Sequence, residues 1–220
     1  GDLHRHICEL QLAHRTMMTA RSGLPGHAVY NRVRNAMEIF ACRYGGVAVA
    51  TSKGQLQAWL VEWVATRDES VRGPPNTWDV SRVTDMSYLF KKKELEKFND
   101  EIGAWDVSNV SNMSGMFFGC KSFNQALDTW DVSQVTNMSG MFLSASSFDQ
   151  PLAAWNVSQV TTMEGMFYSA SSFDQPLSTW DIHPDCNMSG MFRNASAMSP
   201  SHKPKKKKEE EGGGGDDKMD

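Results

Sequence analysis

The sequence predicts an α/β solenoid of about five repeats, and two observations carry this prediction. One motif returns along the chain, and its clearest copy runs from Trp130 to Phe142 as W-D-V-S-Q-V-T-N-M-S-G-M-F. Its tryptophans stand at residues 78, 105, 130, 155 and 180, so the period is 27 residues once and 25 residues thereafter. A fixed period of this length is typical of repeat proteins in which each unit packs on its neighbours.

The part of the chain before the repeats is expected to be helical. Residues 1–50 form a poorly defined helical segment, with one helix expected near 31–42 and a weaker pattern over 3–18. Residues 51–75 are expected to hold a capping helix and a linker, because Ser52 and Gln55 have the spacing of a capping box. A helically spaced apolar run follows them, and we expect this helix to cover the open end of the repeats.

Each 25-residue coil is expected to hold one short helix and one short strand. Met138, Met141, Phe142 and Ala145 recur at i, i+3, i+4 and i+7, which is one face of about two helical turns. Residues 148–152 and 155–160 alternate or contain β-branched side chains, which suits short extended segments. Stacked coils would then place their strands side by side in a parallel sheet.

The periodic aromatic and methionine side chains are expected to form the core of the repeats. A methionine-rich surface can also be a binding groove, but regular placement beside phenylalanine favours packing inside. The predicted core comprises Trp105, Trp130, Trp155, Trp180, Met138, Met141, Phe142, Met163, Met166 and Phe167.

The repeats are expected to span residues 76–198, with a disordered charged tail over 199–220. The last copy departs from the motif at 183–186 and lacks the later Gln-Pro-Leu, as terminal repeats often do. The tail consists of a basic run, three glutamates, four glycines and a charged end. Such a composition does not bury a core.

Charge and motif content exclude several functions. Residues 101–200 hold nine acidic residues but only Lys121 and Arg193 as basic ones, so we expect no nucleic acid to bind the repeats. No apolar run is long enough to cross a bilayer, and the first residues lack the layout of a secretory signal. The histidines and cysteines match no metal pattern, and neither a catalytic triad nor a phosphate loop is present. We therefore expect a protein without enzyme activity, cofactor or metal.

One polar ladder follows the tryptophans and has two interpretations. It comprises Asp79, Asp106, Asp131, Asn156 and Asp181. A column of carboxylates suggests a binding surface for calcium, but one Asp per repeat supplies few of the six to eight oxygens that calcium takes. The alternative is an Asx turn, in which each side chain holds a nearby backbone N–H.

A second polar ladder and a set of glycosylation sequons also recur. The ladder comprises Asn99, Asn124, Asp149 and Asp174, each followed by a polar residue that is Gln in the last three copies. Such side chains either bond to one another internally or form an exposed binding face. The N-x-S/T sequons are Asn109, Asn112, Asn137, Asn156, Asn187 and Asn194.

The repeat resembles a known family. The run W-D-V-S-x-V-T-x-M-S-x-M-F, followed by A-S-S-F-D-Q-P-L, is similar to the BspA-type surface-protein repeat. That repeat is a relative of the leucine-rich repeats and was first catalogued as a domain of unknown function in mycoplasma lipoproteins. The resemblance implies a right-handed, leucine-rich-repeat-like solenoid with structural positions but no catalytic residue.

Two functions of different kinds follow from these observations. The first is a non-enzymatic interaction or adhesion module that presents an extended acidic surface to a protein or glycan partner. The resemblance places such a module at the cell surface or outside the cell. The alternative is a scaffold in the cytoplasm or nucleus, with the basic run at 203–208 as its address. An enzyme with its site in residues 1–50 is a third interpretation, which no visible catalytic group supports.

Overall fold

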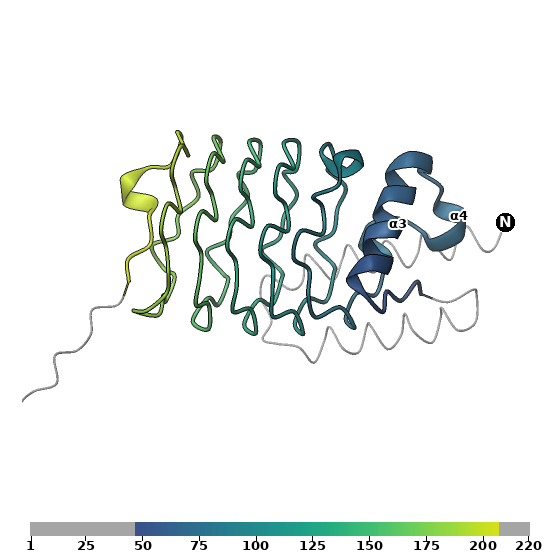
Figure 1. Ribbon diagram of the computed structural model, residues 1–220, viewed down its shortest axis with the longest axis horizontal. Coiled ribbons are helices and arrows are strands. Elements are labelled where there is room, and N and C mark those ends of the chain that lie inside the picture. The colour runs from purple at the N-terminus through teal and green to yellow at the C-terminus, as the bar shows by residue number, and fades with distance from the viewer. Residues whose placement is uncertain (1–46, 207–220) are drawn as a thin grey trace, which may run out of the picture. The chain divides into compact units, whose positions relative to one another are not determined.

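The computed structural model describes residues 47–206 of the chain (Figure 1). Contacts divide the chain into two units, Gly1–Val47 and Ala48–Asp220. The elements in chain order are α3 Lys53–Thr66, α4 Glu69–Arg72, and the 3-10 helices η2 Pro75–Thr77, η3 Lys93–Leu95 and η4 Pro200–His202. The helices expected near 3–18 and 31–42, and the tail beyond residue 206, lie outside the described residues.

Helix α3 has both of its ends fixed by local hydrogen bonds. The Ser52 hydroxyl accepts the N–H of Gln55 at 3.3 Å and caps the first turn. The Gln55 side chain in turn accepts the N–H of Thr51 at 2.9 Å. In a standard capping box it would accept the N–H of the N-cap residue itself, which is Ser52 here. The helix ends at Arg67, which takes a left-handed φ of 55° and donates its N–H to the Trp63 carbonyl.

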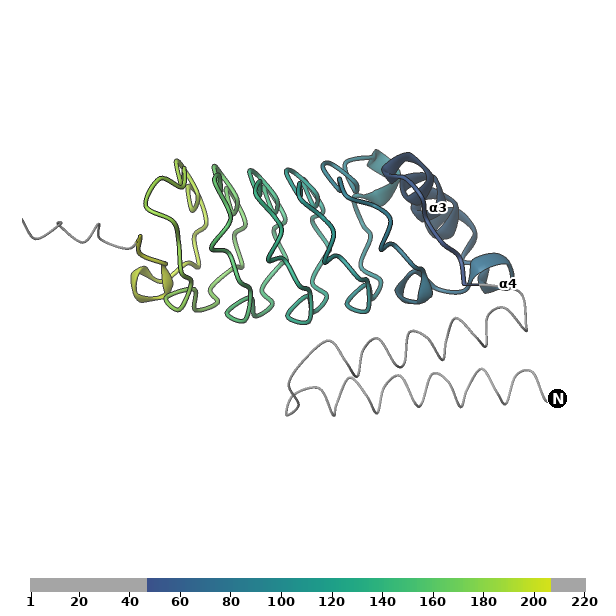
Figure 2. The ribbon, with the colours of Figure 1, turned by 90° about the horizontal axis from the view of Figure 1, so that it is seen from below.

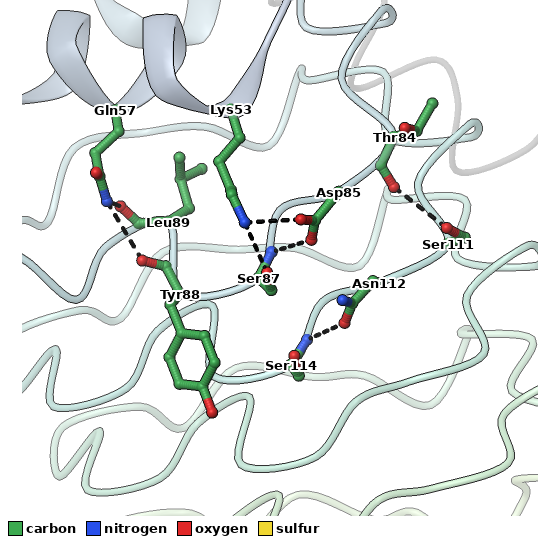
Figure 3. Close-up of polar contacts among 10 residues, drawn as sticks. All are labelled: Lys53, Gln57, Thr84, Asp85, Ser87, Tyr88, Leu89, Ser111, Asn112 and Ser114. Atoms are coloured by element: carbon green, nitrogen blue, oxygen red, sulfur yellow. Dashed lines mark hydrogen bonds and ion pairs between the residues drawn. The ribbon is translucent and has the colours of Figure 1, made fainter.

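Helix α3 covers the first repeat with apolar side chains and with hydrogen-bond donors. Its buried residues are Leu56, Leu60 and Trp63. Beside them, Lys53 Nζ lies 2.7 Å from Asp85 Oδ2, and Gln57 Nε2 donates to the Leu89 carbonyl at 2.7 Å (Figure 3). The side chains of α3 therefore donate hydrogen bonds to oxygen atoms on the facing side of the first repeat.

A recurrent set of backbone N–H groups in each repeat donates to carbonyls of the next repeat, while other bonds, such as Thr136 N–H to the Ser111 carbonyl, run the opposite way. The N–H groups of Met113, Gly115, Phe117 and Gly119 donate at 2.8–2.9 Å to the carbonyls of Asn137, Ser139, Met141 and Leu143. The same four bonds recur 25 residues later, from the next repeat to the one after it. The repeats accordingly lie side by side in a row in both views (Figures 1 and 2).

The predicted composition of each coil, one strand and one helix, is wrong. Residues 47–206 contain no strand, and the repeats meet in isolated parallel bridges between Asp85, Asn112, Asn137, Thr162 and Asn187. The repeats contain no α-helix either, because α3 and α4 both precede them. The described chain is therefore neither an α/β fold nor the right-handed, leucine-rich-repeat-like solenoid that the resemblance implied.

Left-handed residues explain why the expected helix does not form. Gly140 and Ser144 have φ of 59° and 58°, and a left-handed residue interrupts a right-handed helix. Between them the chain makes turns, in which Met141 N–H donates to Met138 at 3.2 Å and Ala145 N–H to Phe142 at 3.0 Å. Successive turns thus produce the same i, i+3, i+4, i+7 spacing of buried residues that a helix would produce.

The segments expected to be strands are turns for a similar reason. Phe148 N–H donates to Ala145, Trp155 N–H to Leu152, and Val160 N–H to the carbonyl three residues before it. These bonds are made within one repeat, so the N–H groups are not available for a sheet. The buried side chains here are Phe148, Leu152, Trp155, Val157 and Val160, whose uneven spacing follows from the turns and not from a strand.

Aromatic ladders fill the core of the repeats. The rings of Phe117, Phe142, Phe167 and Phe192 stack at centroid distances of 5.4, 5.5 and 5.6 Å. The core residues named from the sequence are all buried, with at most 4% of any of them exposed: Trp105, Trp130, Trp155, Trp180, Met138, Met141, Phe142, Met163, Met166 and Phe167. These side chains supply most of the apolar area that the stack removes from water.

Each tryptophan also links its repeat to the preceding one. The indole N–H of Trp130 donates to the Ile102 carbonyl at 3.2 Å, and that of Trp155 donates to the Leu127 carbonyl at 2.9 Å. These bonds satisfy the only polar atom of a buried ring. Tryptophan therefore serves both the core and the connection between repeats.

The packed part of the chain continues past the boundary expected at residue 198. Residues 199–206 follow the last repeat, where Leu177 N–H donates to the His202 carbonyl at 2.8 Å and Ile182 bridges to Lys206. Pro204 is buried in this segment. These residues therefore pack along residues 174–182.

Two glycine substitutions should change stability in opposite directions. Gly140→Ala places a Cβ on a residue with φ of 59° and should lower the free energy of unfolding by roughly 1–2 kcal/mol. Gly54→Ala, within α3 and with no atom within 4 Å of the new Cβ, should raise it by roughly 0.5–1 kcal/mol. Urea unfolding of both variants measures the two changes. Equal stability of the Gly140 variant and the wild type would contradict the turn geometry.

Candidate interaction surface

The polar ladder that follows the tryptophans forms Asx turns. The Oδ1 atoms of Asp79, Asp106, Asp131 and Asn156 accept the backbone N–H two residues later, at 2.9, 3.1, 3.0 and 3.2 Å. Asp181 holds the same position in the last repeat and is exposed. Among residues 47–206, no group of three or more His, Cys, Asp or Glu side chains could hold a metal ion. The Asx-turn interpretation therefore describes this ladder.

The second polar ladder is an internal hydrogen-bond chain. The Oδ1 atoms of Asn99, Asn124 and Asp149 accept the backbone N–H of the equivalent residue in the next repeat, at 2.8, 2.9 and 3.0 Å. The glutamine that follows adds a second donor, as Gln175 Nε2 does to Asp149 Oδ1 at 2.9 Å. These side chains are occupied in joining repeats, which limits what they offer to a partner.

Asp174 ends this ladder and is held by the segment after the last repeat. Its Oδ1 accepts the Ser199 N–H at 2.7 Å, its Oδ2 accepts the Ser199 hydroxyl at 3.0 Å, and His202 Nδ1 lies 3.0 Å from Oδ1. The backbone N–H of Ser199 is the main reason why the pKa of Asp174 lies below its ordinary value of 3.8. The Ser199 hydroxyl and His202 lower it further.

An exposed apolar row runs across the turns of the repeats, and we call it the turn stripe. It comprises Tyr88, Phe118, Leu143 and Tyr168. Tyr88 and Phe118 are 46% and 37% exposed, which is high for aromatic rings, and the other two are half-buried. Phe118, Leu143 and Tyr168 occupy one position in successive repeats, directly after the buried Met-Phe pair.

Backbone bonds fix the register of the turn stripe. Gly119 N–H donates to the Leu143 carbonyl, and Ser144 N–H to the Tyr168 carbonyl, both at 2.8 Å. Because neighbouring segments joined in this way lie about 4.8 Å apart, the stripe residues form a closely spaced row. The spacing of these side chains is therefore set by the backbone hydrogen bonds between repeats.

Tyr88 lies flat over the second repeat. A Cβ on Gly115 would come within 2.3 Å of the Tyr88 ring, so only glycine fits beneath it. The ring points away from α3 (Figure 3), and Lys91 Nζ lies 4.8 Å from its centroid and 5.6 Å from that of Phe118. At the other end of the stripe, the Arg193 guanidinium lies 5.8 Å from the Tyr168 ring. A cation therefore accompanies each end of the stripe.

The turn stripe was missed by the reasoning from sequence. The search for repeated positions selected residues that stay constant, whereas this position changes from Lys91 through Phe118, Leu143 and Tyr168 to Arg193. Variation at one exposed position within an otherwise constant motif is the signal that would have found it.

Two overlapping stretches of the chain, residues 61–152 and 93–204, match a family described as "Mycoplasma protein of unknown function, DUF285". Together they span residues 61–204, which is well over half of the 220 residues. The chain belongs to this family. No curated protein and no solved structure matches the chain.

The described cysteines of this DUF285 chain are unsuited to nucleophilic chemistry. Cys120 and Cys186 are free and buried. Burial, with a smaller effect of Glu96, raises the pKa of the Cys120 thiol to about 12, and burial also raises that of Cys186. Thiols with raised pKa values stay protonated near neutral pH.

The sequon asparagines fall in different environments. Asn109, Asn156, Asn187 and Asn194 are exposed, whereas Asn112 and Asn137 are half-buried at the bridges between repeats. Asn194 donates from Nδ2 to the Tyr168 hydroxyl at 3.4 Å. Glycosylation of these residues stays a prediction. Among residues 47–206, no helix combines the length and apolar character that crossing a bilayer requires.

The contribution of the Asp174 carboxylate to stability should disappear in acid. Asp174→Asn keeps an acceptor for the Ser199 N–H but removes the charge. Because the pKa is lowered in the folded state, the unfolded chain takes up the proton first as pH falls. The stability advantage of the wild type over the variant should be complete above pH about 5 and shrink below pH about 4. Urea unfolding of both proteins from pH 6 to 3 tests this, and a constant difference would contradict it.

Proposed function

We propose that the repeats form a non-enzymatic interaction or adhesion module, and that the turn stripe is the surface that contacts a protein or glycan partner. The observation that carries this proposal is the exposure of Tyr88 and Phe118, because the other large aromatic rings among residues 47–206 are mostly buried. Exposed aromatic rings in a row are costly in water unless a partner covers them.

The polar ladders are weaker candidates for the contact surface. The side chains of Asp106, Asp131 and Asn156 hold their own turns, and those of Asn124 and Asp149 hold the next repeat. A partner that bound them would have to replace these bonds, and a hydrogen bond exchanged for another yields little net free energy. The ring faces of the turn stripe hold no turn or neighbouring repeat in place, and their internal contacts are with the exposed cations Lys91 and Arg193.

Aromatic side chains suit both classes of partner. Tyr and Phe bury a large area while few rotatable bonds become ordered, and they are enriched at the centres of protein interfaces. Their faces also attract the polarised C–H groups of sugars.

The resemblance to BspA-type surface proteins supports a function in adhesion. The absence of enzyme activity is part of the proposal, because the recurrent Asp and Asn side chains hold turns or join neighbouring repeats. An adhesion module needs a rigid surface and a repeated spacing, and the backbone bonds between repeats provide both.

Binding should depend on the turn stripe and not on exposed apolar area in general. The double variant Phe118→Ser/Tyr168→Ser should weaken any specific binding at least tenfold, since truncation of central aromatic residues commonly costs that much. Val71→Ser is the matched control, because Val71 is 63% exposed and lies outside the stripe. The full chain and both variants are applied to immobilised panels of glycans and of extracellular-matrix proteins.

Thermal unfolding of the double variant shows whether a loss of binding comes from the surface alone. A wild type that binds no member of either panel would contradict the proposal. Equal binding by the wild type and the double variant would also contradict it.

A further inference from the structure

Four backbone N–H groups of the last repeat lack a carbonyl acceptor among residues 47–206. In the second, third and fourth repeats, four alternate N–H groups donate to the carbonyls of the following repeat. The equivalent N–H groups of Met188, Gly190, Phe192 and Asn194 donate to no carbonyl of the described residues. We call residues 188–194 the donor edge. Unpaired backbone groups in a row are a template for another chain.

Helix α3 covers the opposite end of the row. The carbonyl side of the first repeat lies under α3, where Gln57 donates to Leu89 and Lys53 approaches Asp85 and Ser87 (Figure 3). A second copy of this chain therefore has no open carbonyl edge to offer from its described residues. The occupant of the donor edge has to come from a different kind of segment.

The segment after the last repeat stops short of the donor edge. Residues 199–206 pair with residues 174–182, and their last bridge joins Ile182 to Lys206. Gly190 and Asn194 are exposed, and Met188 and Phe192 are half-buried. The donor edge is therefore accessible along its length in the described part of the chain.

Positive charge gathers at this end of the row. Lys203 Nζ lies 5.7 Å from the Phe192 ring, and Lys206 Nζ donates to the Pro184 carbonyl at 2.7 Å. Arg193 lies within the donor edge itself. The exposed carboxylates near the donor edge are Asp181, Asp185 and Glu164, whose Oε2 accepts from Asn187 Nδ2 at 3.3 Å. Four N–H groups and these cations together favour a segment rich in negative charge.

We propose that the donor edge binds an acidic, glycine-containing segment of a partner protein, which adds to the row as a further layer. Within the chain, the four receiving carbonyls come from a seven-residue stretch, 137–143. The fourth residue of that stretch is Gly140, which has a left-handed φ of 59°. A segment with acidic residues around a central glycine meets both the geometric and the electrostatic requirement. This proposal is independent of the turn stripe.

A synthetic heptapeptide tests the donor edge directly. The probe is acetylated and amidated Glu-Glu-Glu-Gly-Glu-Glu-Glu, with the Gln-for-Glu heptapeptide as a charge control. Addition of the acidic peptide to the full chain should shift the backbone amide signals of Met188, Gly190, Phe192 and Asn194 and slow their hydrogen exchange. The neutral peptide should bind more weakly.

Matched charge reversals at the two ends of the row sharpen the test. Lys203→Glu should weaken binding of the acidic peptide roughly three- to fivefold. Lys92→Glu, an equal charge change on an exposed residue of the first repeat, should leave it unchanged. Amide spectra of the remaining residues confirm that both variants are folded.

Three outcomes would overturn the proposal. Shifts confined to the lysines at 205–208 would show attraction of charge without pairing at the edge. Slow exchange of the four amides before any peptide is added would show that the chain itself covers them. Equal binding of the acidic and neutral peptides would remove the assigned role of charge.

Discussion

The recurrent hydrogen bonds that alternate N–H groups of one repeat make to carbonyls of the next are the constraint on which the rest of the structure depends. Each repeat sends alternate N–H groups to the carbonyls of the next one, and the intervening N–H groups close turns within the repeat. This division requires left-handed residues at regular places, which glycine supplies at 115, 140, 165 and 190. It also stacks equivalent side chains, so phenylalanine meets phenylalanine and methionine meets methionine through the core.

A stack built in this way has two ends that differ chemically. One end shows carbonyl oxygens and is closed by donors from α3, while the other shows N–H groups. The polar ladders also end differently, since Asp174 is held by Ser199 and His202 in place of another repeat. The two surfaces proposed for recognition, the turn stripe and the donor edge, are ones that the stacking of repeats does not use.

Part of this architecture could be predicted from the sequence. The period and the buried positions follow from the recurrence of Trp130, Met138 and Phe142 in the other copies. The secondary structure could not be predicted in this way, because consecutive turns bury residues at the same spacing as a helix. Gly140 within the supposed helix was the clue against it. The turn stripe escaped because Phe118 and Tyr168 occupy a position that varies, and only stacking places them in one row.

Through-hydrogen-bond scalar couplings measured by NMR test the central claim most directly. The account predicts correlations between the amide nitrogen of Gly115 and the carbonyl carbon of Ser139, and between Phe117 and Met141, which are 24 residues apart in each case. Correlations from Phe117 to the carbonyl of Met113, four residues earlier, would indicate a helix in each repeat. That result would contradict the account.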